Sequence, residues 1–222
     1  MHNQILFFAA LLTLLSACHS RQRAEAIRRL AEPQTLNAVK EYMNGKWESI
    51  AVELRPGEDR TGSGQVQSTY LRRRFEYHAN DMFTGVITLY ADNYGKLPLM
   101  EFEFRGHLNW GEPHSVAKGA WNLDYVLDEG FGVTPLHEQA ADMLNTALPP
   151  GMPSFKSGVK QDILRKAFPL FNISEGQIVT DYDLIYFSHG MLFMGAKHVN
   201  GMPFDKPENR PHQLQIPLRK TS

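Results

Sequence analysis

Asp181 and Asp183 are the two residues whose spacing could most directly support catalysis. Residues i and i+2 of a β-strand point to the same side, so the two carboxylates would lie together. Paired carboxylates can do acid–base work or bind calcium. The polar face of an amphipathic strand has the same spacing, and we expect the pair to lie on such a solvated face. A hydrolase that uses them with a nearby histidine is therefore a weak alternative.

The chain contains none of the common catalytic or cofactor-binding motifs. It has no GxSxG, HExxH, CxxC, phosphate-binding loop or EF-hand loop. Its nine histidines are scattered along the sequence. His107 and His114 are the best candidate pair for a metal site, but they lack the spacing typical of zinc sites. We expect a protein that is not an enzyme, with no catalytic residue, no metal and no cofactor.

Arg73 lies within a run of three arginines, residues 72–74. If this run is a strand, Arg73 shares its face with Phe75 and Tyr77 and is buried with them. A buried arginine needs a partner. It is either one half of an ion pair with a carboxylate across the sheet or an anchor for an anionic group of a ligand.

Cys18 is the only cysteine, and it follows Leu15-Ser16-Ala17 at the end of the apolar run 5–15. A short apolar run before small residues is typical of a secretory signal. A cysteine at this place resembles the lipobox of bacterial lipoproteins, in which the signal is cut before the cysteine and the cysteine is acylated. The other interpretations are a plain cleavable signal and a membrane span, but the run is shorter than the roughly 20 residues a span needs.

The sequence thus predicts a signal peptide over residues 1–17 and lipidation of Cys18. The sequence implies a membrane as partner: the protein would be anchored through the acylated cysteine to a membrane of the bacterial cell envelope. His19 and Ser20 follow the cysteine, with no aspartate, which favours the outer membrane if the host has one. The protein partner is unknown.

Composition bounds the mature part of the chain. The 222 residues carry a net charge of −1, without the basic excess that nucleic-acid binding usually requires. One cysteine excludes an internal disulfide, so packing must hold the fold. With 42% hydrophobic residues, one domain with a sizeable core is expected.

Hydrophobic periodicity predicts a helical segment, then strands, then two helices, then strands. Residues 18–44 are expected to form a helical tether and residues 45–222 the domain. Expected strands cover residues 47–54, 67–78, 82–90, 99–110, 118–128, 177–187, 191–199 and 213–218, with turn residues between them. Helices are expected after Thr134 up to about residue 149 and over residues 158–168. Long amphipathic strands with short connections indicate an antiparallel meander that curls into an open or closed β-barrel.

A barrel of this size can enclose one small ligand. The inward aromatic residues are therefore candidates for a binding site for a lipid or other apolar molecule, with Arg73 at an anionic head group. The candidate residues are Trp47, Phe75, Phe102, Phe104, Trp121 and Tyr125. The alternative is a structural or protein-interaction lipoprotein of the cell envelope in which the same residues form a solid core.

Several short segments resemble the APCDD (adenomatosis polyposis coli down-regulated) domain family. They are Asn44-Gly45-Lys46-Trp47-Glu48-Ser49, Glu53-Leu54-Arg55-Pro56-Gly57, Phe104-Arg105-Gly106, Gly119-Ala120-Trp121, Leu192-Phe193-Met194-Gly195 and Leu214-Gln215-Ile216-Pro217-Leu218. The resemblance covers about residues 44–218 as a single copy of the domain.

The resemblance implies a lipocalin-like β-barrel with an apolar cavity suited to lipid chains. Animal members are extracellular, membrane-attached antagonists of Wnt signalling. Val52 stands where the animal pattern has a cysteine, and the loop at residues 93–95 also lacks one. A Wnt-related role is therefore not carried over to a chain that looks like a bacterial lipoprotein.

Overall fold

The fold is mainly antiparallel β-sheet. A computed structural model describes residues 32–56, 68–146 and 148–221. Helix α2 (Leu36–Met43) precedes strands β1 (Gly45–Ser49), β2 (Glu53–Pro56), β3 (Ser68–Tyr77), β4 (Met82–Tyr90), β5 (Pro98–Pro113) and β6 (Trp121–Pro135). Helix α3 (Glu138–Asn145), β7 (Gln161–Asp162), the 3-10 turn η1 (Pro169–Phe171), β8 (Val179–Ser188), β9 (Met191–Met194), the 3-10 turn η2 (Pro207–Asn209) and β10 (Leu218–Lys220) follow.

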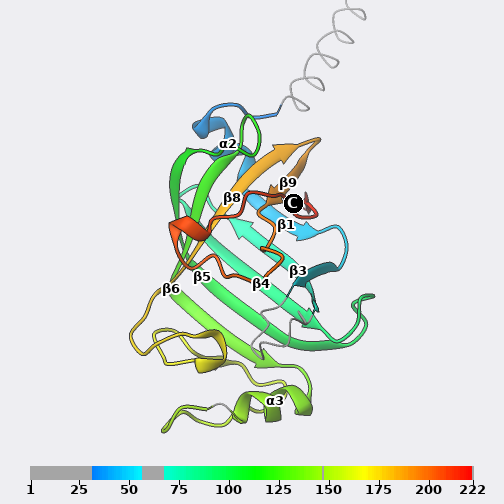
Figure 1. The fold of residues 1–222 in the computed structure, drawn as a ribbon, viewed down its shortest axis with the longest axis vertical. Coiled ribbons are helices and arrows are strands. Elements are labelled where there is room, and N and C mark those ends of the chain that lie inside the picture. Colours follow the sequence, from blue (N-terminus) through cyan, green and yellow to red (C-terminus); the bar gives the residue numbers. More distant parts are fainter. Residues whose placement is uncertain (1–31, 57–67, 147, 222) are drawn as a thin grey trace, which may run out of the picture.

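The strand pairings form a ring. Each neighbouring pair is hydrogen-bonded in the order β1, β10, β9, β8, β6, β5, β4, β3, and β1 then pairs again with β3, Trp47 opposite Phe75. All these pairs are antiparallel. Strand β2 follows β1 along the same edge of β3. Figure 1 shows the strands with α2 at one end and α3 at the other.

Alternation along the strands separates an inner from an outer face, as predicted. In β5, Met100, Phe102, Phe104, Gly106 and Leu108 are buried, whereas the residues that alternate with them are partly or fully exposed. Side chains of the other strands add to the same inner face. The buried apolar side chains of the other strands of the ring include Trp47, Phe75, Tyr77, Phe83, Leu123, Tyr125, Ile185, Phe187, Leu192, Met194 and Leu218.

Gly106 marks an irregularity in the long β5–β6 pair. The register shifts between Arg105 and His107, which is the behaviour of a β-bulge. A Cβ at Gly106 would overlap the carbonyl oxygen of Val126 on β6. Only glycine allows the two backbones to approach this closely, and β6 then continues to Pro135 instead of ending near Asp128.

Helix α2 packs onto one end of the ring. Its residues Val39 and Met43 belong to the hydrophobic core. The indole Nε1 of Trp47 donates to the carbonyl oxygen of Met43 at 2.7 Å, and Lys40 Nζ lies 2.7 Å from Asp81 Oδ2. The described part of the expected helical tether is therefore fixed to the strands; residues 18–31 lie outside the described residues.

The predicted helix over residues 158–168 is wrong. Gln161 and Asp162 form β7 against β6, and the amide of Ile163 donates to the carbonyl oxygen of Phe131 at 2.7 Å. Gly158 and Arg165 have positive φ angles of 73° and 58°, which a helix does not tolerate. Ile163 and Phe168 of this segment are buried in the core, whereas Val159 is exposed.

Other boundaries shift by a few residues. Helix α3 begins at Glu138 instead of after Thr134, because Thr134 still pairs with Glu101 in the sheet. The strand expected over residues 47–54 is two strands with a bend between them. The last strand begins at Leu218, after an isolated bridge between Leu214 and Gly195. No helix among residues 32–56, 68–146 and 148–221 combines the length and the apolar character that crossing a membrane requires.

The close approach at the bulge makes Gly106 a sensitive position. Gly106→Ala should lower the free energy of unfolding by about 1–3 kcal/mol, because a rigid backbone carbonyl blocks the added methyl group. Gly130→Ala on β6 is the matched control, since the nearest atom there belongs to the flexible side chain of Arg105. Urea denaturation measures both; equal losses would show that the bulge is not the constraint.

Candidate functional site

The predicted ligand-binding aromatics are brought together inside the ring, where they pack against one another. The Phe75 ring centroid lies 5.9 Å from that of Phe104 and 5.8 Å from that of Tyr125. Trp47 is 5.5 Å from Phe187. Ring separations of this size are those of contacting aromatic pairs. This part of the interior is therefore filled by the side chains themselves.

Phe102 and Trp121 lie at the margins of this set. The Phe102 ring contacts Phe171 edge-on, with centroids 5.1 Å apart. Trp121 is only partly buried, and its indole Nε1 is enclosed without a hydrogen-bond partner in the structure. All six predicted aromatics thus face the interior. The predicted lipidation site, Cys18, lies outside the described residues.

Two depressions lie elsewhere on the described surface. One, of about 290 Å³, lies between α2 and the neighbouring ends of the strands and is lined in part by Lys40, Asp81 and Trp110. The other, of about 300 Å³, is lined mainly by outward side chains of β1, β3, β4 and β5, and also by Arg73. None of the six aromatics lines either depression.

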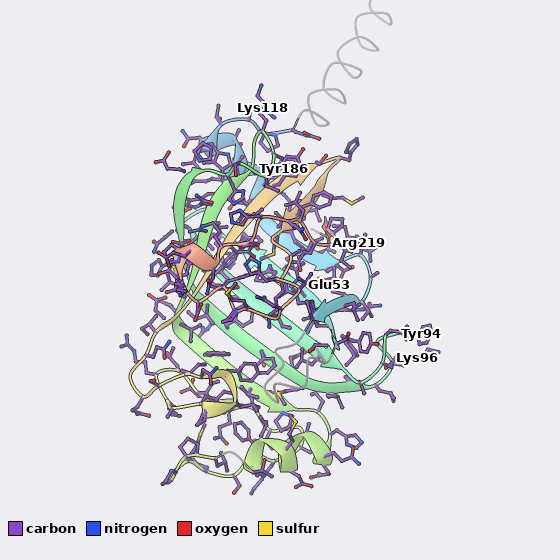
Figure 2. All side chains as sticks on the ribbon, viewed as in Figure 1. Glu53, Tyr94, Lys96, Lys118, Tyr186 and Arg219 are labelled. Carbon is purple, nitrogen blue, oxygen red and sulfur yellow. The ribbon has the colours of Figure 1, made fainter. Side chains whose placement is uncertain are left out.

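Arg73 forms the predicted buried ion pair. Its Nε donates to Glu53 Oε1 at 2.7 Å, and the side chains of Arg73 and Glu53 are 1% and 3% exposed. Ser49 links the strands, because its hydroxyl donates to Glu53 Oε1 and accepts from the Arg73 amide. Arg73 Nη1 reaches across the ring to Met194 Sδ on β9, at 2.8 Å. Figure 2 draws the described side chains as sticks and labels Glu53.

A second arginine lies beside the first. Arg55 Nη2 donates to Gln215 Oε1 at 2.6 Å, and Arg55 Nε is 3.6 Å from Glu53 Oε2. Burial and the neighbouring charge of Arg73 lower the pKa of Arg55. Two guanidinium groups therefore share one side of the interior with a single glutamate.

Four polar atoms of this region are buried and lack hydrogen-bond partners in the structure. They are Glu53 Oε2, Arg55 Nε, Arg73 Nη2 and Gln215 Nε2. Three of the four are donors. Native proteins rarely leave such atoms unpaired, so each requires an explanation.

Asp181 and Asp183 face this interior, Asp183 buried and Asp181 partly buried, so the prediction of a solvated face is wrong. Asp183 is 1% exposed, and its Oδ1 accepts from the amides of Leu184 at 2.7 Å and Gly195 at 2.8 Å. A Cβ at Gly195 would overlap that carboxylate and the ring of Pro211, so only glycine permits the bond. In the register of β6 and β8, Asp181 lies opposite Tyr125.

Burial controls the acidity of the pair. Burial and the charge of Asp183 raise the pKa of Asp181 to about 7, against the effect of Arg55, Arg73 and Lys197. Burial raises the pKa of Asp183 to about 6, although its two backbone hydrogen bonds and the arginines oppose this shift. The two carboxyl groups therefore titrate as a coupled pair, and the net charge of the pair changes near neutral pH.

Two tyrosine hydroxyls complete the interior near the aspartates. Tyr77 and Tyr125 are hydrogen-bonded through their oxygens at 2.9 Å. Burial raises the pKa of both, so they stay neutral. We call Ser49, Glu53, Arg55, Arg73, Asp181, Asp183 and Gln215 the interior polar cluster.

Arg210 fixes the C-terminal segment against this side of the ring. Its Nη1 donates to the backbone oxygen of Asp183, and its Nη2 lies 2.6 Å from Asp124 Oδ1. The amide of Gln215 donates to the Met194 carbonyl at 3.0 Å. This segment thereby brings Gln215 to Arg55.

The hydrolase hypothesis requires a histidine beside the aspartates. Within the described ranges, no histidine is hydrogen-bonded to Asp181 or Asp183. The two histidines weighed for a metal are apart: His107 Nδ1 lies 2.8 Å from Asp128, and His114 packs beside His212. No group of three or more metal-ligating side chains occurs among the described residues.

Neither the models of known protein families nor the curated protein sequences match this chain. The resemblance to the APCDD domain remains a prediction that rests on the short segments given above.

Sequence reasoning missed Glu53, Arg55, Gln215 and the burial of Asp183. Only strand alternation could have indicated that Glu53 and Arg55 lie together, since residues i and i+2 of a strand point to the same face. Gln215 carried no signal, because its partner is 160 residues away and depends on how the C-terminal segment folds.

The ion pair makes a double-substitution prediction possible. Arg73→Met should lower the free energy of unfolding by about 3–5 kcal/mol, because it removes the close charge partner of the buried Glu53 and leaves only the more distant Arg55. Arg73→Met with Glu53→Leu should restore it to within about 1 kcal/mol of the wild type. Urea denaturation near pH 5, where the aspartates are mostly protonated, measures both. A double variant as unstable as the single one would contradict the pairing.

The aspartate pair should make stability depend on pH. The folded-state pKa of Asp181, about 7, lies above its ordinary value of 3.8, so protonation favours the folded state. Its contribution is complete below about pH 4 and is lost as the pH rises to about 7. Asp181→Asn should flatten this fall in the free energy of unfolding. Glu112→Gln, an exposed acid on β5, is the control. Parallel curves for the wild type and Asp181→Asn would refute the assignment.

Proposed function

We propose that this protein is a lipid-anchored envelope protein that binds an amphiphilic, lipid-like molecule inside a lipocalin-like β-barrel. The anchor is the acylated Cys18, and the barrel is the closed ring of strands. The apolar part of the ligand contacts Phe75, Phe102, Phe104 and Trp121, and Arg73 lies at its head group. The role is binding without catalysis.

The interior polar cluster is the observation that carries this proposal. A ring of strands that served only as a solid core would gain nothing from buried charges, since replacing a buried ion pair by apolar residues is often neutral or stabilising. Here the ring buries Arg73 and Glu53 almost completely and places Asp183 beside them. Unpaired donors next to an apolar surface are what an amphiphile with a polar head requires.

Aromatic packing limits where the ligand can lie. The contacts of Phe75 with Phe104 and Tyr125 fill one level of the interior. Phe102 and Trp121, which lie at the margins of the aromatic set, are the better candidates for contact with an apolar chain. Entry of a chain between Phe75 and Phe104 requires these rings to change rotamer.

The same packing favours a second candidate function. If the aromatic set stays closed, the protein is a structural or protein-interaction lipoprotein of the envelope with a solid core. The tight burial of Trp47 against Phe187 supports this alternative. The two functions differ in one measurable property, which is whether a molecule is held without a covalent bond.

Native mass spectrometry of the full chain, taken gently from membranes, separates these functions. The wild type should show the mass of the acylated chain plus a molecule that is released on collisional activation. Cys18→Ser should lose the covalent acyl mass and keep the releasable molecule, because the interior is unchanged. Acylated protein without any releasable molecule, also after incubation with lipids extracted from the same cells, would favour the solid core.

A further inference from the structure

The unpaired donors of Arg55, Arg73 and Gln215 converge on one side of the interior. Arg55 and Gln215 are hydrogen-bonded to each other, and Arg55 and Arg73 both face Glu53. Each of the three side chains has one buried nitrogen without a hydrogen-bond partner in the structure: Nε of Arg55, Nη2 of Arg73 and Nε2 of Gln215. Buried donors that lack an acceptor are costly, by about 1–3 kcal/mol each and more for charged groups.

We infer that these three nitrogens form a subsite for one anionic group, a carboxylate or a phosphate, and that this group competes with the charge of Asp181 and Asp183 for the two arginines. This inference rests on the proposed binding of an amphiphile, whose head the subsite would hold. Guanidinium groups suit it, because their fixed fork of donors matches carboxylate and phosphate oxygens.

The charges that face the cluster balance when all its carboxylates are ionised. The cations are Arg55 on β2, Arg73 on β3 and Lys197 after β9. The carboxylates are Glu53 on β2 and the aspartate pair on β8. Three positive charges therefore meet three carboxylates. Arg210, which donates to the backbone oxygen of Asp183, is paired with Asp124 and adds no net charge. The ring contributes no further charge here, since Tyr77 on β3 and Tyr125 on β6 stay neutral and β1, β9 and β10 present Ser49, Met194 and Leu218.

An anion can enter this cluster only if another negative charge leaves. With all carboxylates ionised the cluster is neutral, and an added anion would be buried without a counter-charge. One proton on the aspartate pair leaves a single positive charge beside the unpaired donors. The raised pKa values, about 7 for Asp181 and about 6 for Asp183, allow this proton to bind at mildly acidic pH.

The direction of the pH effect follows. Filling the subsite takes up a proton, so the affinity for an anion must rise as the pH falls from about 8 to about 5. A neutral molecule with the same chain gains nothing from the proton. This distinguishes the inference from the proposed function, which concerns the apolar part of the ligand.

The test uses 1-decanesulfonate, whose charge is constant over this pH range, and 1-decanol, which has the same chain and no charge. Isothermal titration calorimetry of the full chain carrying Cys18→Ser measures both below micelle-forming concentrations. We expect the sulfonate to bind at least about tenfold more tightly near pH 5 than near pH 8. A tenfold change in affinity corresponds to the contribution of about one charge-assisted hydrogen bond. The decanol affinity should stay the same.

The decisive variant is Asp181→Asn, because we expect it to gain affinity for the sulfonate, which a misfolded protein would not do. It removes one negative charge from the cluster, so its sulfonate affinity near pH 8 should exceed that of the wild type by about tenfold. Glu112→Gln removes an exposed acid on β5 and should leave the affinity unchanged.

Each outcome decides between the two claims. The anionic subsite would be overturned if both probes bound and their affinities showed the same dependence on pH. It would also be overturned if Asp181→Asn bound the sulfonate no more tightly than the wild type. Either result would leave the apolar site standing. Binding of neither probe at either pH would overturn the proposed function itself. The unpaired donors would then be satisfied by water.

Discussion

The buried ion pair between Arg73 and Glu53 is the interaction on which the interior depends. Arg73 extends from β3 to Met194 on β9, and Glu53 receives both the guanidinium and the Ser49 hydroxyl. These contacts tie together β1, β2, β3 and β9 at the place where the ring closes. A charge buried in this way must keep its partner, so the relative positions of these strands are constrained by electrostatics as well as by packing.

The apolar packing and the polar cluster occupy different parts of the ring. Phe75, Phe83, Phe104 and Tyr125 contact one another, which gives a well-packed core with defined ring geometry. Next to them, Asp183 lies on the edge of β8 that pairs with β9, where the Gly195 amide reaches its carboxylate. The molecule therefore combines a stable scaffold with a region whose protonation changes near neutral pH. Perturbed pKa values of this kind mark the region as a candidate functional site.

Close backbone approaches at two glycines make this arrangement possible. Gly106 allows the long β5–β6 pair to shift register and continue, and Gly195 lets its amide reach Asp183. The C-terminal segment then folds back, held by Arg210, and delivers Gln215 to Arg55. Residues far apart in the chain thus meet in the interior polar cluster through the backbone geometry of a few positions.

The sequence by itself determined the class of the fold, because strand periodicity is local. The alternation of Met100, Phe102 and Phe104 with polar residues places these side chains correctly, and Arg73 was predicted to be buried from the same pattern. Periodicity gave the wrong prediction over residues 158–168, where an apolar spacing that suits a helix belongs to a segment that pairs with the sheet. It also failed for Asp181 and Asp183, since alternation shows that two residues share a face but not which face is inside. Only ring closure decided that, by turning this face of β8 inward and bringing Arg55, Glu53 and Gln215 to it from strands and segments distant in sequence.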